Sequence, residues 1–537
     1  MRRFKLAKGG KILVFLLIIV MVSLGIFQGV KRGFIKMKKA DKETFYTAKN
    51  KKDTSKTMAE EGASGDKRDI AAKNNTINLS LDEWIGWKSI IDAAGGLTTQ
   101  PGSIFDELGI NVNIHVINDA TQSSNALIKG DLDAAGYTIN RIAFLSQKFT
   151  DAGVPVIMPY ITNYSNGGDG IIATNNFQTV ESLVNARIGV PQFSEAHSLV
   201  VWFVNQSDLS EGQKQQIINN LIFFETPDEA AKAFFAGQID VAATWQPYLT
   251  QATTTSNCHV LFSTASSTKL IMDGILFRKD FADSNPELVS KFIEGSLKAA
   301  DKYNSEFNAV RTAMPMFAGE SDESIKSMTE DAALTDYASN IKTLKEEAPV
   351  VFADMCNVWK SVGENVNSDM ITGLFDTKYS EVLSEKFSMI ETVNTEKNRA
   401  VVTDDNRQNI INAEALLSKA VTVNFIANTC NFMDNKEASN SLAEFVDIAK
   451  TLDGTVIQIE GNVASDNTTE AERILSEQRA ETVKKFLIVN GINANRIITV
   501  GNGGAKPIIP NRNPDGSLSK EATDANRRTD IYFKTVE

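Results

Sequence analysis

The sequence has few of the residues that metal centres and disulfide frameworks need. Cysteine and histidine occur three times each, at Cys258, Cys356, Cys430, His115, His197 and His259. The cysteines are odd in number and far apart, so they predict no disulfide framework and no metal-ligand spacing. The histidines are equally scattered, and we therefore predict no bound metal.

Motifs for catalysis are also missing. The chain has no Gly-x-Ser-x-Gly, Walker-type or zinc motif, and its histidines lack a nearby Ser/Asp pattern. The paired acids Asp131 and Asp133 lie at a Gly/Asp-rich junction, where a solvated turn is expected rather than acid–base catalysis. We predict no catalytic residues, no cofactor and no enzyme. The net charge of −12 argues against a nucleic-acid partner, whose phosphates would be repelled.

The N-terminal part of the chain has the features of a membrane anchor. Residues 12–30 are an uncharged apolar run that would extend about 28 Å as a helix, enough to cross a bilayer. Residues 1–11 are basic and predict a cytoplasmic tail, whereas the polar residues 31–75 predict a flexible tether. A cleaved signal peptide is the alternative, but the run is long for one and no Ala-x-Ala-like site follows it.

The length of the chain predicts three or four domains, of which the largest is expected at residues 76–390. Strand-like and helix-like segments alternate there in two similar halves, which predicts an α/β domain of two lobes with a cleft between them. A helical segment at residues 351–366 is expected to pack across both lobes. The polar residues 391–415 predict a second linker.

Five short motifs occur in order along this region. They are EWIGW at residues 83–87, Leu-x-x-Gly-x-x-Asp at 127–133, YSNGGDG at 164–170, SEAHS at 194–198, and FAGQID at 235–240 running into WQP at 245–247. Their order and spacing resemble the substrate-binding proteins of the ABC-type nitrate, sulfonate, taurine and thiamine-precursor group. The resemblance implies a type II periplasmic-binding-protein-like fold that closes on a small molecule.

The candidate ligand site lies in the cleft, because loops at the carboxyl ends of strands bind ligands in open α/β sheets. Tryptophans would supply flat apolar walls, glycines would bring bare backbone N–H groups close, and a helix N-terminus after residue 194 would favour an anionic or polar group. Three of these features also have a structural alternative: tryptophan is usually core, His197 could cap a helix or pack, and the GGDG segment could be only a tight turn. The ligand-binding candidates are Trp87, Thr138, Ser165, Gly168, Asp169, Ser194, His197, Trp245 and Asp273.

The C-terminal region, residues 416–537, contains an arginine in an unexpected place. Residues 470–489 predict an amphipathic helix, and Arg479 lies on its apolar stripe between Leu475 and Val483. A buried guanidinium needs an acceptor, because an unpaired buried charge is costly. With NRRT at residues 526–529, this pattern resembles the OmpA-like peptidoglycan-binding domain, an α+β fold in which the helix arginine grips a peptide-stem carboxylate.

Two positions depart from that family's pattern. Ala464 stands where the family has an aspartate that holds the amine of the ligand, and Glu472 stands where it has an asparagine. Asp466 is a possible substitute for the missing aspartate. The candidate peptidoglycan-binding residues are Arg479, Asn526, Arg527, Arg528 and Asp466.

Together the resemblances imply a membrane-anchored, single-pass solute-binding protein with the bulk of its chain outside the cytoplasmic membrane. It would capture a small anionic or planar ligand, deliver it to an ABC-type permease, and dock on the cell wall through its C-terminal domain. The alternative is a wall-associated scaffold or sensor whose main role is peptidoglycan binding. An enzyme built on the same two-lobed fold is a third possibility, which the sparse catalytic residues disfavour.

Overall fold

The computed structural model describes residues 72–535 apart from positions 268, 390–399, 422, 424, 427, 467 and 518. Within these residues no helix is both long and apolar enough to cross a membrane. The predicted basic tail at 1–11, the predicted span at 12–30 and all but the end of the predicted tether lie outside the described residues.

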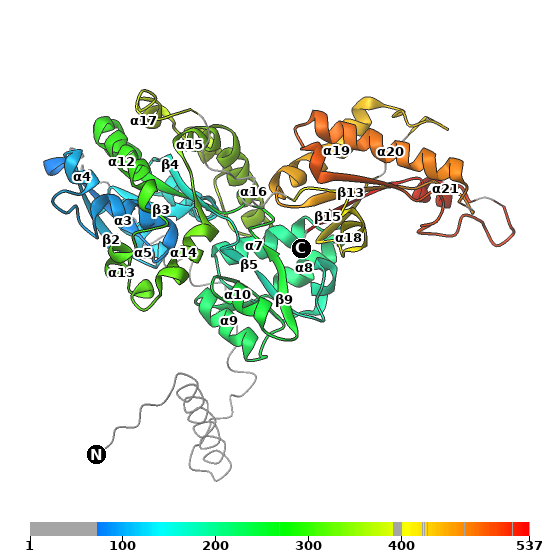
Figure 1. Cartoon of the computed structure of the whole chain (residues 1–537), viewed down its shortest axis with the longest axis horizontal. Coiled ribbons are helices and arrows are strands. Elements are labelled where there is room, and N and C mark those ends of the chain that lie inside the picture. The colour runs from blue at the N-terminus through cyan, green and yellow to red at the C-terminus, as the bar shows by residue number, and fades with distance from the viewer. Residues whose placement is uncertain are drawn as a thin grey trace, which may run out of the picture. The chain divides into compact units, whose positions relative to one another are not determined.

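The first lobe is built on a mixed six-stranded sheet with the strand order β11-β4-β10-β3-β1-β2. β1 pairs in parallel with β2 and β3, whereas β10 runs antiparallel to both β3 and β4. The strands are β1 (Thr76–Leu81), β2 (Asn111–Val116), β3 (Ala134–Thr138), β4 (Val156–Ser165), β10 (Met272–Arg278) and β11 (Ala332–Leu334). The helices of this region that come before the crossing are α3 (Lys88–Ala94), α4 (Ile104–Glu107), α5 (Ala120–Lys129) and α6 (Ile139–Asp151) (Figure 1).

The second lobe has a five-stranded sheet with the order β7-β6-β8-β5-β9. Its strands are β5 (Asp169–Thr174), β6 (Ile188–Pro191), β7 (Ile222–Phe224), β8 (Val241–Trp245) and β9 (Cys258–Ser263). Its helices are α7 (Glu195–Asn205), α8 (Glu211–Asn219), α9 (Pro227–Phe235) and α10 (Tyr248–Thr254) (Figure 1). α7, α8 and α9 each begin after a side-chain cap; that of α7 is Ser194, whose hydroxyl accepts from the backbone N–H of His197.

The chain crosses between the lobes twice, from β4 into β5 and from β9 back to β10. The two crossings are tied together by the hydroxyl of Thr264, which accepts from the backbone N–H of Gly167 at 2.9 Å and lies 2.8 Å from the hydroxyl of Ser165. The backbone N–H of Ser165 also donates to the carbonyl of Ile271. These bonds fix the strands that lead into the cleft from both sides.

A helical region after β10 completes the two-lobed domain. Its helices are α11 (Lys279–Ser284), α12 (Pro286–Lys298), α13 (Asn308–Ala313), α14 (Asp322–Asp331), α15 (Tyr337–Lys342), α16 (Ala348–Ser361) and α17 (Lys378–Glu381). α16 contacts α6 of the first lobe and α7 of the second. Trp359 on α16 donates its indole N–H to the carbonyl of Asn140 on α6, and its ring packs edge-on against His197 on α7. The prediction that this segment packs across both lobes is confirmed.

The C-terminal domain is a four-stranded sheet with the order β12-β15-β13-β14, and α19 and α20 run along one face of it (Figure 1). Its elements are α18 (Arg407–Asn412), β12 (Leu417–Val421), α19 (Asn435–Thr451), β13 (Val456–Gly461), α20 (Glu470–Val489), β14 (Ile497–Gly501), α21 (Lys520–Asn526) and β15 (Thr529–Lys534). α20 has the bounds that periodicity predicts. Glu472 accepts from the backbone N–H of Thr469 and forms a capping box, so the glutamate at the family's asparagine position stabilises the start of this helix.

Part of the predicted linker packs on this domain. Ile410 on α18 is buried with Val456 and Ile498 of the sheet. The ammonium group of Lys534 donates to the carbonyls of Ile410 and Ile411. Residues 400–412 therefore contribute to the C-terminal core.

Candidate functional site

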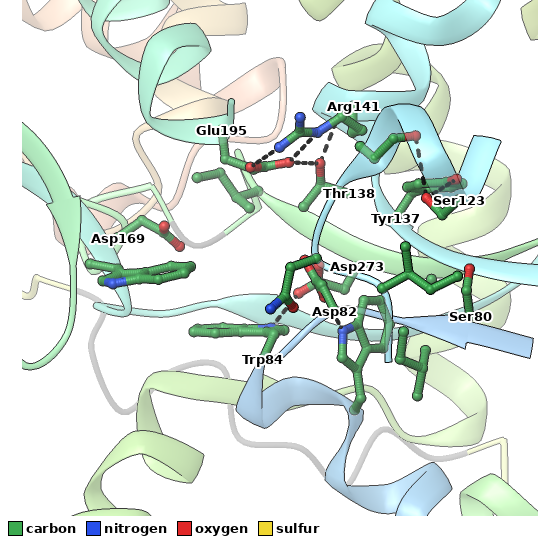
Figure 2. Close-up of a pocket in the computed structure, with 18 residues that line it drawn as sticks. Ser80, Asp82, Trp84, Ser123, Tyr137, Thr138, Arg141, Asp169, Glu195 and Asp273 are labelled. Carbon is green, nitrogen blue, oxygen red and sulfur yellow. Dashed lines mark hydrogen bonds and ion pairs between the residues drawn. The ribbon is translucent and has the colours of Figure 1, made fainter. Parts of the chain in front are cut away.

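A cavity lies between the two lobes at the ends of their strands, and Figure 2 shows the side chains around it. Its volume is about 60 Å³. A buried water needs about 10–15 Å³ measured in this way, so the cavity suits a ligand of a few heavy atoms. Both lobes line it, with Ser80, Leu81, Asp82, Trp84, Trp87, Ile117, Asn118, Ala120, Ser123, Gly136, Tyr137, Thr138, Arg141, Ile271 and Asp273 on one side and Asp169, Glu195 and Trp245 on the other.

The first lobe contributes an indole and a carboxylate that are bonded to each other. Trp84 follows β1, and its indole N–H donates to Asp273 Oδ2 at 2.9 Å. Asp273 is the second residue of β10 and lies opposite Thr138 of β3 in the sheet. Asp82 binds the neighbouring indole in the same way, since Trp87 donates to Asp82 Oδ1 at 2.6 Å. The sheet register thus brings residues far apart in sequence to one wall of the cavity.

The second lobe repeats this combination. Trp245 ends β8 and pairs in register with Asp169, the first residue of β5. The indole N–H of Trp245 donates to Asp228 Oδ1 at 3.0 Å, and Asp169 Oδ2 accepts from the hydroxyl of Ser165 at 2.7 Å. The ring planes of Trp84 and Trp245 lie within 11° of parallel, with their centroids 6.5 Å apart. Each lobe therefore brings at least one indole and two carboxyl groups to the cavity, and the indoles are held by their N–H groups.

An ion pair joins the lobes beside this pair of rings. The guanidinium of Arg141 on α6 donates from Nε and Nη2 to the two carboxylate oxygens of Glu195 on α7, at 3.2 and 2.9 Å. The hydroxyl of Thr138 donates to the same carboxylate at 2.8 Å (Figure 2). Thr138 also caps α6, because its hydroxyl accepts from the backbone N–H of Arg141. The Glu195 carboxylate thus lies beside the start of α6, bound by two side chains of its first turn.

Burial of carboxylates dominates the electrostatics of the cavity. Burial raises the pKa of Asp169 to about 7, against a lowering by the Ser165 hydroxyl. Burial also holds the pKa of Asp273 well above its usual range, and the neighbouring acids Asp82, Asp169 and Glu195 raise it further. Burial acts in the same direction on Glu195, but Arg141 outweighs it and lowers the pKa of that carboxyl. The cavity therefore holds one paired carboxylate and two buried carboxyls that would gain from a cation.

The predicted ligand-binding residues fall into two groups. Five of them line the cavity: Trp87, Thr138, Asp169, Trp245 and Asp273. Ser165 acts through its hydrogen bond to Asp169. Gly168 lies against Trp84, where a Cβ would come within 3.1 Å of the ring atom Cη2, so the missing side chain lets the crossing segment approach the indole.

Ser194 and His197 are not among the residues that line the cavity. Ser194 caps α7 and donates to the carbonyl of Pro191. His197 is only 3% exposed, and its ring packs edge-on against Phe223 and Trp359. Both residues have a structural role, which for His197 is the packing alternative that the sequence left open, and the helix that they begin packs against α16.

The prediction missed cavity residues next to those it chose. Trp84 belongs to the same EWIGW motif as Trp87, and Glu195 lies between Ser194 and His197 in the SEAHS motif. The two motifs therefore indicated the right segments of the chain. They did not indicate which of their side chains reach the cavity, because that depends on packing in the folded protein. Arg141 follows Thr138 by one helical turn, and its role could have been inferred only from knowing that α6 and α7 begin at the same cavity.

The C-terminal domain brings two cations together near the start of β15. Arg479 is 7% exposed, and its Nε donates to the carbonyl of Thr429 at 3.1 Å. Its guanidinium lies 5.0 Å from the centre of the Phe425 ring. Burial lowers the pKa of Arg479, and the neighbouring charge of Arg527 lowers it further. Among the described residues, Arg479 has no carboxylate partner, so the site favours an added anion.

The remaining candidates of this domain have partners within the fold. Asp466 binds the guanidinium of Arg512 at 2.5 Å, and Arg528 donates to Asp530 at 2.9 Å. Asn526 is 1% exposed and holds the preceding loop, accepting from the backbone N–H of Ile508 and donating to the carbonyl of Ile509. Arg527 is exposed. Within the described part of the chain, no cluster of three or more His, Cys, Asp or Glu side chains is placed to hold a metal ion.

Comparison with known proteins identifies two families in the chain. Residues 93–305 match the NMT1/THI5-like family, and residues 425–520 match the OmpA family. The crystal structure of the periplasmic aliphatic sulphonate binding protein SsuA from Escherichia coli is similar over 57% of this chain and 99% of its own, with 15% sequence identity and a TM-score of 0.45.

Curated relatives are similar over shorter segments. The photosystem I P700 chlorophyll a apoprotein A2 of Gloeobacter violaceus is 34% identical over 99 residues, 18% of this chain and 11% of that protein. Outer membrane protein A of Bordetella avium is 35% identical over 95 residues, 18% of this chain and 46% of that protein. The peptidoglycan-associated lipoprotein of Buchnera aphidicola is 28% identical over 140 residues, 26% of this chain and 76% of that protein. The chain thus spans less than half of the first two relatives, and it joins an NMT1/THI5-like domain to a C-terminal domain of the OmpA family.

Proposed function

We propose that this protein is an extracytoplasmic solute-binding protein that delivers a small ligand to an ABC-type importer. The observation that carries the proposal is the cavity between the lobes, to which both lobes contribute tryptophan rings and carboxyl groups. A ligand held by both sides stabilises the closed arrangement of the lobes, which is the expected signal to a transport partner. The two crossing segments, which hydrogen bonds to Thr264 tie together, are the candidate hinge for this closure.

The C-terminal domain is proposed to dock on peptidoglycan. Arg479 and Arg527 carry like charges that lie close together. Burial makes the positive charge of Arg479 still less favourable. A carboxylate of the peptide stem would relieve both costs, because it would supply the missing counter-charge. Ala464 provides no second carboxylate, and Asp466 is bound to Arg512, so we expect a weaker grip on the amine of the ligand.

We also propose that residues 12–30 anchor the chain in the cytoplasmic membrane. The uncharged run is long enough to span a bilayer, and a solute-binding domain and a wall-binding domain both require the outer side. A single anchor with a tether would let the binding domain meet its permease while the C-terminal domain contacts the wall.

Calorimetry on the full-length protein tests solute binding. Sulfonates, nitrate, phosphate, aminopyrimidines and small guanidinium compounds are titrated separately. We expect one class to bind, and Trp245→Ala to abolish the heat because the mutation removes one wall of the cavity. Thr253→Ala is the control, because this exposed residue of α10 is not among those that line the cavity. Heat from none of these compounds would contradict solute transport and favour the wall-associated scaffold or sensor.

Co-sedimentation with purified peptidoglycan tests wall docking. Arg527→Ala removes an exposed charge and should reduce the bound fraction without affecting the fold. Arg479→Lys keeps a charge but cannot bind a carboxylate in the two-pronged manner of arginine. Arg473→Ala is the matched control, because this arginine lies on the same helix and binds only Glu470 and Glu477. Equal sedimentation of all four proteins would contradict the proposed wall site.

A further inference from the structure

The charges of the cavity indicate which class of solute it binds. We propose that it selects a small flat cation with N–H donors, of the guanidinium or amidinium type. This inference rests on the proposed solute-binding function and narrows it. It agrees with the planar ligand expected from the sequence and departs from the anionic one, and the difference in charge comes from one side chain, Glu195.

The cavity has more negative than positive side chains. Its lining includes four carboxyl groups, and Arg141 is the only lysine or arginine among the described residues that line it. That guanidinium is already used, because both of its carboxylate-facing bonds go to Glu195. The carboxyls of Asp169 and Asp273 have no ion-pair partner among the described residues, and Asp82 shares the charge of Arg141 with Glu195. An incoming cation would favour the charged form of these buried carboxyls and pair with them, whereas an anion would find, among the described residues that line the cavity, no cation that is not already paired.

The place where an anion would bind is occupied by the protein itself. A helix N-terminus with an arginine beside it is a favourable site for a carboxylate, sulfonate or phosphate. Here Glu195 takes that position, with its oxygens bound to Arg141 and to the capping hydroxyl of Thr138. A ligand anion would have to displace a two-pronged ion pair that also joins the two lobes. The structure thus offers no vacant anion site at this helix.

The two indoles favour a cation with a flat shape. Trp84 and Trp245 use their N–H groups on Asp273 and Asp228, so the part of each ring left for a ligand is its electron-rich face. Such faces attract guanidinium groups, which can also stack on them. Because the two ring planes are within 11° of parallel, a flat group that stacks on one ring is also aligned with the other.

The buried carboxyls require N–H donors from the ligand. Asp169 accepts one hydrogen bond from Ser165, and Asp273 accepts one from Trp84. Each carboxylate has capacity for further donors, and a buried acceptor without them is costly. A guanidinium or amidinium group supplies several N–H donors in one plane, whereas a quaternary ammonium supplies none. The cavity of about 60 Å³ also matches a small group of this kind.

Isosteric probes of different charge test this inference on the full-length protein. Methylguanidinium, methylurea and nitrate are flat and similar in size, but their charges are +1, 0 and −1, and tetramethylammonium is a cation without N–H groups. Isothermal titration calorimetry should show methylguanidinium binding at least about 100-fold more tightly than methylurea, as expected when buried acceptors lose a charged donor. Nitrate and tetramethylammonium should give no measurable heat.

Variants then connect the preference to the cavity. Asp273→Asn should weaken methylguanidinium binding by about 10- to 100-fold, because a charged hydrogen bond becomes a neutral one. Asp169→Asn should also weaken binding, because this carboxyl lines the cavity from the other lobe. If the Asp273→Asn protein does not fold, Asp169→Asn takes its place in the test. Glu107→Gln on α4 removes an exposed acid away from the cavity and should leave binding unchanged.

The outcomes separate this inference from the proposed function. If nitrate binds and methylguanidinium does not, solute binding stands and the cation inference falls. If tetramethylammonium binds as tightly as methylguanidinium, the requirement for N–H donors is wrong and the inference falls as well. If none of these probes and none of the compounds in the earlier panel gives heat, both the inference and the solute-binding function are overturned.

Discussion

The ion pair between Arg141 and Glu195 should be a main contributor to holding the two lobes together. It combines two parallel hydrogen bonds with opposite charges, and each side chain is only 22% exposed. Exposed pairs contribute about 0.2–1 kcal/mol, whereas breaking a fully buried pair costs about 3–5 kcal/mol. For this half-buried, two-pronged pair we expect a coupling free energy of about 1–3 kcal/mol between the two side chains.

A double-mutant cycle measures this coupling. The free energy of unfolding is determined for the parent, Glu195→Gln, Arg141→Gln and the double variant by urea titration. Tryptophan fluorescence is a selective probe, because all five tryptophans lie between Trp84 and Trp359 and the C-terminal domain has none. The unfolding signal therefore reports on the two-lobed domain alone.

The pair Arg187 and Asp240 is the matched control. It has the same two-pronged geometry, but it lies within the second lobe and Arg187 is 52% exposed. Its coupling free energy should fall in the range of about 0–1 kcal/mol. A coupling for Arg141 and Glu195 that is no larger than that of the control would refute the conclusion that this pair joins the lobes.

Three further predictions concern pH, packing and the C-terminal core. Burial raises the pKa of Asp169 to about 7 from an ordinary value of 3.8, so between these values the native state keeps a proton that the unfolded chain has released. The unfolding free energy should therefore fall by up to about 4 kcal/mol as pH rises from 4 to 7, and Asp169→Asn should flatten this slope in fluorescence-monitored urea titrations at several pH values. Gly136→Ala would place a Cβ 2.9 Å from a ring carbon of Trp87, and the same titration should show a loss of about 1–3 kcal/mol. Arg496 is 5% exposed and donates to the carbonyls of Ala449, Leu452 and Thr455. Arg496→Leu leaves these acceptors unsatisfied, so calorimetry should show the C-terminal domain destabilised by about 2–4 kcal/mol, and an unchanged transition would contradict this role.

Local patterns were sufficient for much of the fold. The helix at residues 470–489 follows from its apolar period, and the hydroxyl of Thr469 begins it by capping. The α/β alternation also follows from short segments of sequence. These features depend on interactions between residues close in the chain, which a sequence displays directly. The position of α16 across both lobes was expected as well, but it is held by long-range contacts such as that of Trp359 with Asn140.

The candidate site was predictable only in part. Trp245, Asp273 and Asp169 were recognised because they lie in motifs at strand ends. The prediction omitted Trp84 because its motif holds two tryptophans. Which tryptophan ring faces the cavity depends on packing, which the motif does not show. The same limit explains why His197 was expected at the cavity, although its ring packs against Phe223 and Trp359.

The α/β domain with its binding-protein-like motifs and the OmpA-like C-terminal domain could be predicted from the order of residues alone. The charge of the cavity could not, because Arg141 and Glu195 are 54 positions apart and meet only where α6 and α7 begin at the same cavity. Their pairing uses the cation that an anionic ligand would need and leaves Asp169 and Asp273 without one. Electrostatic character depends on distance in space, which a list of residues does not contain.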